Sequence, residues 1–307
     1  MSGMMAARAI CGAPEEIVGE TDEHDLGDAF EELSAVEVVG EHKGLVAVLA
    51  LPKEQVKALV PEGFTLDDVK GRHHVIVTCG ERYNTRLTFP SILPSQTYKE
   101  VMIAIPSVNP PGRACACGRK GPFLYVAKIY VNNLLVAAGG KAWGIDIANA
   151  DLRQDRSLDG GTYRWQVIAN REPLIVVESR GVESRVEGQV RPLNQFDSFE
   201  NIRNMLAQPI LSSSWKGRLM TCADMKWNLD LALAKKVSPT VRFGGSLLAG
   251  ALRGKHPSPK IRKIKDEVQD RAIESFALLR HRWRLSAPGV CRLSFLRRSA
   301  HETEAGE

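Results

Sequence analysis

The sequence has 307 residues, of which 44% are hydrophobic, and it carries a formal net charge of +5. No apolar run approaches the roughly 18 residues that cross a bilayer as a helix, and six scattered cysteines do not suggest a disulfide scaffold. We expect a cytoplasmic protein because the first residues lack the apolar segment of a secretory signal. Arg8 lies in an acid-free stretch, which leaves a short organelle-targeting segment open.

Charge and composition divide the chain into three predicted parts. Residues 1–35 form an acidic, weakly ordered arm, residues 36–240 form the folded body, and residues 241–307 form a basic, partly helical tail. A basic segment can contact nucleic acid or an anionic membrane surface. We expect neither partner, since such a segment is more often a solvated face and the acidic arm of the same chain can pair with it.

The body opens with segments that are typical of β structure. Four segments rich in Val, Ile and Leu are predicted as strands: 34–40, 44–52, 73–83 and 98–108. A polar turn joins the first two, and a short helix at 53–61 follows them. A loop rich in Pro and Gly follows the fourth strand at 109–122.

The segment FLYVAKIYVNN at 123–133 gives the clearest strand pattern. Strict alternation places Leu124, Val126, Lys128 and Tyr130 together on one face. If that face lines an apolar interior, Lys128 is a desolvated amine. The alternative is an ordinary lysine that points to solvent.

The rest of the chain combines further strands with two predicted helices. The strands are 162–169, 173–181 and 184–193. A helix at 197–209 is capped by Asp197 or Ser198, and the segment 223–237 is ambiguous between helix and strand. Apolar residues then recur at helical spacing from 264 to 283, which predicts an amphipathic helix in the tail.

Several segments, taken in order, resemble the acetoacetate decarboxylase family. LVPEGFTLDD at 59–68 is similar to the segment after the family's first strands, and YKEV at 98–101 is similar to its Tyr-x-Glu strand. GPFLYVAKIYVNN at 121–133 resembles the next strand, AGGKAWGIDIANA at 138–150 stands in the place of the family's GRExWGxPKK loop, and MKWNLDLALAKKV at 225–237 resembles its closing segment. The resemblance implies an α+β fold, mainly antiparallel β, with an acetoacetate decarboxylase-like β-barrel that holds one small ligand.

The loop at 138–150 departs from the family at the residues that carry its chemistry. The family decarboxylates β-keto acids through a Schiff base to lysine, and its loop carries two adjacent amines. Aligned on Trp143 and Gly144, the amine positions fall on Ile147 and Ala148, and Asp146 replaces the preceding proline. Isoleucine cannot form an imine, so the family's reaction is not available at this loop. The predicted pocket residues are Tyr98, Tyr125, Trp143, Gly144, Ile147 and Ala148.

Three ionisable residues are the candidate catalytic groups. The resemblance matches Glu100 to the family's pocket carboxylate, with Tyr98 beside it on the strand. Strand alternation by itself leaves open whether Lys99 or Glu100 points inward. Lys128 and Lys141 are the amines that could replace the missing pair, and the alternative for each is a surface lysine.

Other polar motifs favour no further site. Cys115 and Cys117 could supply two thiolates, but no second pair with ligand spacing accompanies them. His73 and His74 are more typical of a strand start than of a ligand pair, and the serines at 212–214 have no nearby His–Asp partner. We therefore expect no metal and no cofactor.

Two functional hypotheses remain. The first is a lyase of secondary metabolism, a decarboxylase, dehydratase or cyclase, that acts on a keto-acid-like or polyketide-like carbonyl compound without the usual lysine. The second is a non-catalytic ligand-binding or scaffold protein. A buried lysine with a lowered pKa near Glu100 would favour the first hypothesis, and a wholly apolar pocket would favour the second. The resembled family commonly forms oligomers, so a homo-oligomer is also open.

Overall fold

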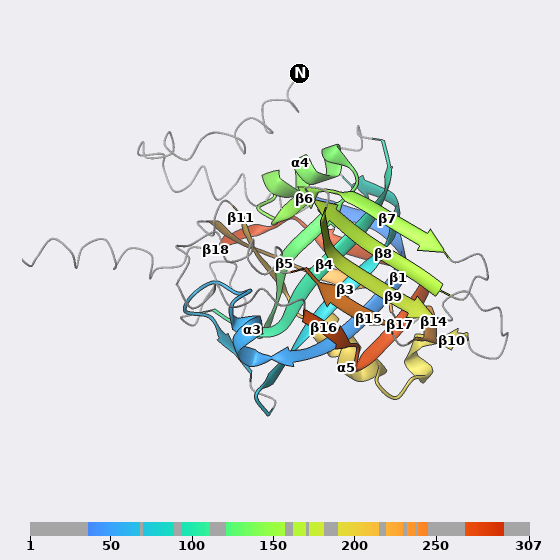
Figure 1. Cartoon of the computed structure of the whole chain (residues 1–307). Helices are drawn as coiled ribbons and strands as arrows, with labels where there is room; N and C mark the ends of the chain where they lie inside the picture. Colours follow the sequence, from blue (N-terminus) through green and yellow to red (C-terminus); the bar gives the residue numbers. More distant parts are fainter. Residues whose placement is uncertain are drawn as a thin grey trace, which may run out of the picture.

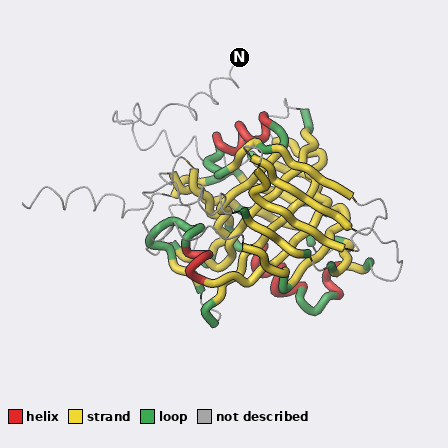
Figure 2. The backbone as a smooth tube through the Cα atoms, viewed as in Figure 1, coloured by secondary structure: helices red, strands yellow, loops and turns green. Residues whose placement is uncertain are grey.

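The computed structural model describes residues 36–67, 70–88, 94–110, 121–156, 162–169, 172–180, 190–214, 219–229, 232–237, 239–244 and 268–291. The described strands form two sheets, and Figure 1 shows the smaller sheet lying across the larger one. The strands of the two sheets cross each other, as Figure 2 shows. The predicted mainly antiparallel β architecture is confirmed, with two sheets in place of one closed barrel.

The first sheet has 13 strands. Its members are β1 (Glu37–Pro52), β2 (Thr65–Leu66), β3 (Arg72–Leu87), β4 (Gln96–Asn109), β5 (Phe123–Val131), β6 (Ile147–Asn149), β10 (Arg191–Pro192), β11 (Ile210–Ser214), β12 (Leu219–Ala223), β13 (Met225–Trp227), β14 (Leu233–Lys236), β17 (Glu274–Ser286) and β18 (Gly289–Cys291). Its main order is β10-β14-β17-β1-β3-β4-β5-β11-β12-β18, with β13 on β17, β2 on β4 and β6 on β5.

The second sheet has five strands in the order β16-β15-β9-β8-β7. They are β7 (Asp151–Arg156), β8 (Thr162–Ala169), β9 (Glu172–Arg180), β15 (Thr240–Phe243) and β16 (Val268–Arg271). All of its described pairings are antiparallel. The helical elements are α3 (Lys53–Lys57), α4 (Leu134–Ala142), η1 (Leu193–Gln195) and α5 (Phe199–Leu206). No helix in the described ranges is long and apolar enough to cross a membrane.

β1 is one long strand, and the predicted turn at 41–43 is wrong. Its pairing with β17 shifts register between His42 and Gly44, which marks a β-bulge where the turn was expected. Gly44 lies opposite Gly80 on β3, and a Cβ on Gly80 would come within 2.4 Å of His42 Nε2. The two glycines therefore leave the room that the buried His42 ring occupies.

The amphipathic helix predicted from 264 to 283 is also wrong within the described residues. Residues 268–271 and 274–286 are strands, and β17 pairs with β1 along much of its length. The sequence carries a strand signal here as well, because His281, Trp283 and Leu285 alternate with two arginines. Pairing with the long β1 strand decided between the two periods. Residues 264–267 lie outside the described residues.

A bulge in β5 changes which of its side chains share a face. The pairing of β5 with β4 shifts between Ile103 and Ala104, which places Lys128 opposite Ile103 and Tyr125 opposite Ile105. Lys128 therefore lies on the same face as Tyr125, and not on the face that strict alternation predicted.

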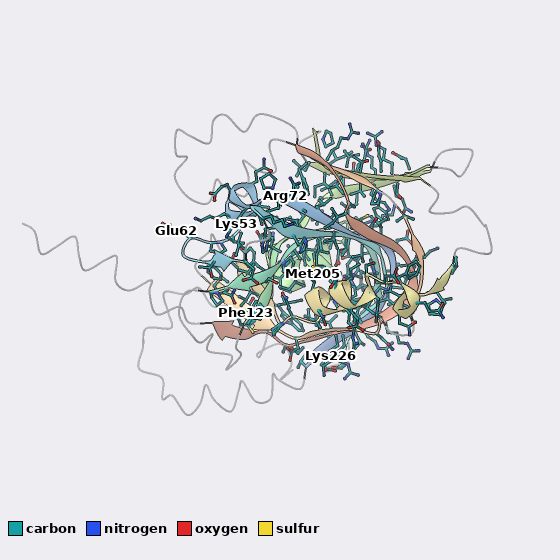
Figure 3. All side chains as sticks on the ribbon, turned by 90° about the horizontal axis from the view of Figure 1, so that it is seen from below. Lys53, Glu62, Arg72, Phe123, Met205 and Lys226 are labelled. Carbon is teal, nitrogen blue, oxygen red and sulfur yellow. The ribbon has the colours of Figure 1, made fainter. Side chains whose placement is uncertain are left out.

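Two apolar cores lie on the two faces of the first sheet. The larger core fills the space between the sheets, with Ile103, Tyr125 and Trp165 among its members. The second core lies on the opposite face and is covered by η1 and α5. Figure 3 shows α5 lying across that face, near the labelled Met205. The helix predicted at 197–209 is confirmed over the shorter range Phe199–Leu206, with Ser198 at its N-cap but without the expected side-chain hydrogen bond.

Candidate functional site

Glu100, the predicted pocket carboxylate, has a buried side chain on β4. Its Oε1 accepts hydrogen bonds from Arg82 on β3, from Nε at 2.9 Å and from Nη2 at 2.5 Å. Only 2% of the Arg82 side chain and 7% of the Glu100 side chain are exposed. The cation beside Glu100 is therefore a guanidinium, and not a lysine amine.

Arg82 belongs to a row of ionisable side chains that crosses four strands. Cross-strand pairs join His281 to His42, His42 to Arg82, and Arg82 to Tyr98, on β17, β1, β3 and β4. The rings of His42 and His281 lie 5.1 Å apart, measured between centroids. All four side chains are buried. Directly paired residues share a face of a sheet, so strands that are distant in the sequence bring these groups together.

Two tryptophans pack against this row. Trp227 on β13 and Trp283 on β17 are cross-strand partners. The Cζ atom of Arg82 lies 5.0 Å from the Trp227 ring centroid and 4.6 Å from that of Trp283, within the range of a cation–π interaction. We refer to six residues as the arginine cluster: Arg82, Glu100, His42, His281, Trp227 and Trp283.

Several polar atoms of the arginine cluster have no hydrogen-bond partner within the described part of the chain. They are Arg82 Nη1, Trp227 Nε1, Trp283 Nε1 and His42 Nδ1. The first three are N–H groups that can only donate. A buried donor without an acceptor costs about 1–3 kcal/mol. The cluster holds three such donors, one on the guanidinium and two on the indole rings beside it. It is therefore suited to bind an oxygen acceptor that a ligand supplies.

Burial also sets the protonation states in the cluster. It lowers the pKa of His42 well below the usual value, and the neighbouring Arg82 and His281 lower it further. Burial raises the pKa of Tyr98, and the Glu100 carboxylate adds to this effect. At neutral pH His42 and Tyr98 are therefore neutral, and Arg82 and Glu100 form a charge-balanced pair.

The loop that was aligned with the family's amine loop begins as the end of a helix. Trp143 follows the last turn of α4 and is half-buried. Gly144 has a φ of +74°, and a Cβ there would lie 2.3 Å from Thr221 Cγ2. Thr221 Oγ1 donates a hydrogen bond of 3.0 Å to the Gly144 carbonyl. Only glycine fits this position, so the fold itself requires the glycine on which the alignment rests.

The two positions matched to the family's amines lie on β6, beside β5. Ile147 is buried in a small apolar cluster that includes Tyr98 and Val131. Val131 is the cross-strand partner of Glu100, so Ile147 lies on the side of the sheet that carries the arginine cluster. Ala148 packs instead against the core between the sheets. That a ligand reaches either residue stays a prediction.

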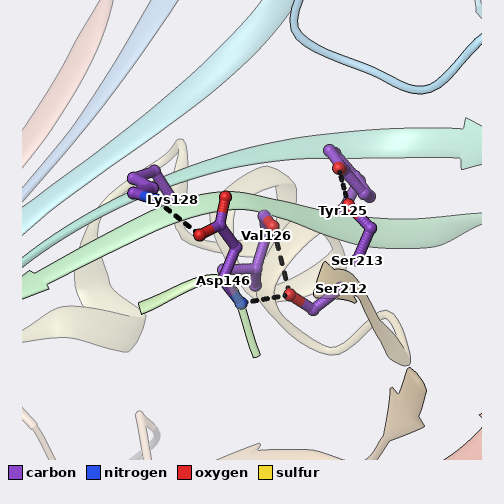
Figure 4. A network of polar contacts seen from close by, with 6 residues as sticks. All are labelled: Tyr125, Val126, Lys128, Asp146, Ser212 and Ser213. Carbon is purple, nitrogen blue, oxygen red and sulfur yellow. Dashed lines mark hydrogen bonds and ion pairs between the residues drawn. The ribbon is translucent and has the colours of Figure 1, made fainter. Parts of the chain in front are cut away.

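Lys128 lies on the opposite face of the first sheet, in a second polar cluster (Figure 4). Its Nζ donates to Asp146 Oδ1 at 2.5 Å, and the backbone N–H of Asp146 donates to Ser212 Oγ at 3.1 Å. The hydroxyls of Tyr125 and Ser213 lie 2.7 Å apart. The Lys128 side chain is 30% exposed and that of Asp146 is 39% exposed. We refer to Lys128, Asp146, Tyr125, Ser212 and Ser213 as the lysine cluster.

The lysine cluster offers hydrogen-bond donors and no free amine nucleophile. An amine held in an ion pair is protonated and has no lone pair with which to attack a carbonyl. Burial raises the pKa of Tyr125 to about 12, and Asp146 adds to this effect. Burial and Asp146 also raise the pKa of Tyr130, on the same strand. Both phenols therefore keep their protons at neutral pH.

The structure separates the three candidate catalytic residues. Glu100 and Ile103, the partner of Lys128, are three residues apart on β4 and point to opposite faces. Glu100 and Lys128 consequently lie on opposite faces of the sheet. Lys141 is exposed, in the last turn of α4. The geometry thus gives no support to a relocated lysine acting beside Glu100.

Most residues of the arginine cluster carry no motif that marks them in the sequence. Arg82 lies in a predicted strand, and Trp227 lies in the segment that resembles the family's closing segment. His281 and Trp283 fall in the predicted helix, although their spacing of two residues is a strand signal that places them on one face. Only the pairing of β17 with β1 brings them to Arg82.

The remaining motifs have structural roles or lie outside the described residues. The ring nitrogens of His73 are each 2.8 Å from a backbone carbonyl oxygen, those of Asp67 and Pro106, so His73 ties neighbouring backbone segments together. Cys115 and Cys117 lie outside the described residues. Within the described ranges, no group of three or more His, Cys, Asp or Glu side chains could hold a metal ion.

Comparisons with known proteins support the fold. No protein-family model and no curated protein matches the sequence. The structure is similar to an acetoacetate decarboxylase-like enzyme from Sphingomonas wittichii RW1, with a TM-score of 0.52, 13% identity, and coverage of 85% of this chain and 93% of that one. It is also similar to acetoacetate decarboxylase from Legionella pneumophila, with a TM-score of 0.47, 13% identity, and coverage of 83% and 87%. The chain therefore has an acetoacetate decarboxylase-like fold, as the resemblance implied.

Proposed function

We propose that this chain binds a small carbonyl compound of the size of a short keto acid, through hydrogen bonds from the arginine cluster and without a covalent bond to lysine. An oxygen of the ligand accepts from Arg82 Nη1 and from the indole N–H groups of Trp227 and Trp283. The observation that carries the proposal is that these three buried donors have no acceptor among the described residues.

The residues matched to the family's pocket add support. Tyr98 and Glu100 come from the segment that resembles the family's Tyr-x-Glu strand, and both are buried beside Arg82. Ile147, at the matched amine position, lies on the same side of the sheet and is apolar. On this side of the sheet the cation is therefore a guanidinium and the matched amine position is apolar, which favours recognition of an oxygen over formation of an imine.

Calorimetric titration with acetoacetate and with its methyl ester tests this proposal. Trp283→Phe keeps an aromatic ring beside Arg82 but removes one donor. We expect it to weaken the binding of both compounds by about tenfold, the value of one hydrogen bond to a ligand. Trp143→Phe is the matched control, because Trp143 lies at the end of α4.

The titration can contradict the proposal in two ways. If neither compound binds the unaltered protein, the unpaired donors are served by buried water alone and the proposal fails. If Trp143→Phe weakens binding and Trp283→Phe does not, the ligand lies at the α4 loop and not at the arginine cluster.

A lyase acting through Lys128 is the second candidate, because the Asp146 carboxylate beside its Nζ is an acceptor to which the ammonium could pass its proton. In that mechanism the ammonium passes a proton to the carboxylate, and the neutral amine adds to the ligand's carbonyl. The proton held by Asp146 then leaves with the hydroxyl group as water, which forms an iminium ion. The iminium ion takes up the electron pair released as CO₂ departs, and the resulting enamine is protonated and hydrolysed, which returns the free lysine. We expect no such adduct when the protein is treated with acetoacetate and borohydride and its intact mass is measured. An adduct that Lys128→Met abolishes and Lys141→Met retains would favour the lyase over the binding protein.

A further inference from the structure

The guanidinium of Arg82 has a carboxylate partner before any ligand binds. The Arg82 guanidinium and the Glu100 carboxylate share two hydrogen bonds and are shielded from water. A carboxylate brought to Arg82 Nη1 would be a second negative charge beside a single positive one. Burying an uncompensated charge is costly, so a carboxylate needs an additional positive charge at this place.

His42 is placed to supply that charge. It stands between Arg82 and His281 in the cross-strand row, and its ring packs edge-on against Trp227 at a centroid distance of 6.0 Å. Its Nδ1 is buried without a hydrogen-bond partner in the described ranges. The ionisable groups that face it are Arg82 on β3 and His281 on β17, with Glu100 and Tyr98 of β4 beyond Arg82.

We propose that the arginine cluster binds carboxylates together with one proton, and that His42 holds this proton while the ligand is bound. The inference rests on the proposed function and names its ligand class, the short keto acids. Before binding, burial and Arg82 keep the pKa of His42 low. A bound carboxylate attracts the protonated ring, so the ring takes up a proton as the acid binds. The methyl ester brings no charge and needs no proton.

Titrations of the full chain with acetoacetate and its methyl ester, in two buffers of different ionisation enthalpy, test the inference. We expect acetoacetate to take up about one proton per molecule bound, and its affinity to fall by about tenfold for each unit of pH above neutrality. The ester should bind with no proton uptake and with an affinity that does not depend on pH. His42→Gln should abolish the uptake and weaken acetoacetate binding, while ester binding shows that this variant remains folded.

His74→Gln is the matched control. His74 also has a pKa lowered by burial, but it lies eight residues from Arg82, near the start of β3. We expect this variant to take up the proton as the unaltered protein does. Binding of acetoacetate without proton uptake, or uptake that survives His42→Gln, overturns the inference and leaves the proposed function standing. Absence of binding by both compounds overturns both.

Discussion

The arginine cluster and the lysine cluster each hold a cation against a carboxylate, but they lie on opposite faces of the first sheet and differ in exposure. Arg82 and Glu100 are buried among aromatic rings, and Nη1 of Arg82 has no partner among the described residues. Lys128 and Asp146 are partly exposed, and Asp146 is held further by Ser212.

The difference indicates what each pair does. A partly exposed ion pair is screened by water and contributes little to stability, and the backbone of Asp146 is held separately by Ser212. A buried pair with unsatisfied donors destabilises the folded protein. This cost is offset where a ligand supplies the missing acceptor. Four predictions test this comparison.

Truncation after residue 240 should have the largest effect. It removes β17, which pairs with β1 and brings His281 and Trp283 to the arginine cluster. We expect no cooperative thermal transition by circular dichroism. Truncation after residue 291, which keeps β18, should preserve the transition. A cooperative melt of the shorter chain would instead support a folded body at 36–240 with a separable tail, as composition alone predicts.

Neutralising the two carboxylates should have unequal effects. Glu100→Gln leaves a buried guanidinium without its counter-charge, and we expect a loss of about 3–5 kcal/mol in the free energy of unfolding. Asp146→Asn acts on a partly exposed pair and should cost about 0–1 kcal/mol. Urea denaturation of both variants measures the difference. Equal losses would mean that the two pairs do not differ in the way their burial indicates.

Acid should destabilise the protein through His42. Its pKa in the folded state is lowered from 6.5, so the unfolded chain binds more protons as the pH falls through that value. The contribution of His42 to the free energy of unfolding is therefore fully present above a pH of about 6.5. Below that pH it declines by at most about 1.4 kcal/mol per pH unit. Melting temperatures between pH 5 and 8 should decline less steeply for His42→Gln than for His74→Gln. The reverse order would contradict the burial of His42.

The smallest effect should come from salt. A double-mutant cycle of Lys128→Gln with Asp146→Asn should give a coupling energy of about 0.5 kcal/mol, which falls in 1 M sodium chloride because the screening length is then about 3 Å. A coupling that is large and insensitive to salt would place the lysine cluster in a shielded environment like that of Arg82 and Glu100.

The sequence predicted most strands of the body and the resemblance that led to Glu100. Prediction from the sequence was wrong where a local pattern is compatible with both a helix and a strand, or where a bulge shifts the alternation. The residues from 268 to 283 fit a helical stripe, but β16 pairs with β15 and β17 pairs with β1, so both segments are strands. In β5, a bulge that no residue type indicates places Lys128 on the face of Tyr125. The periodicity of apolar residues is a property of one segment, whereas the register of a strand depends on the strand with which it pairs.

By itself, the sequence determined that no amine stands at Ile147 or Ala148, because an isoleucine or alanine side chain has no nitrogen in any fold. It also determined the glycine at position 144, which the backbone and Thr221 require. Only the tertiary structure decided that Arg82, His42 and Trp283 meet, since they lie on three strands far apart in the sequence. Burial then changed their chemistry: it shields an ion pair from water, keeps an imidazole neutral and leaves donors without acceptors, and none of these properties belongs to a residue outside its surroundings.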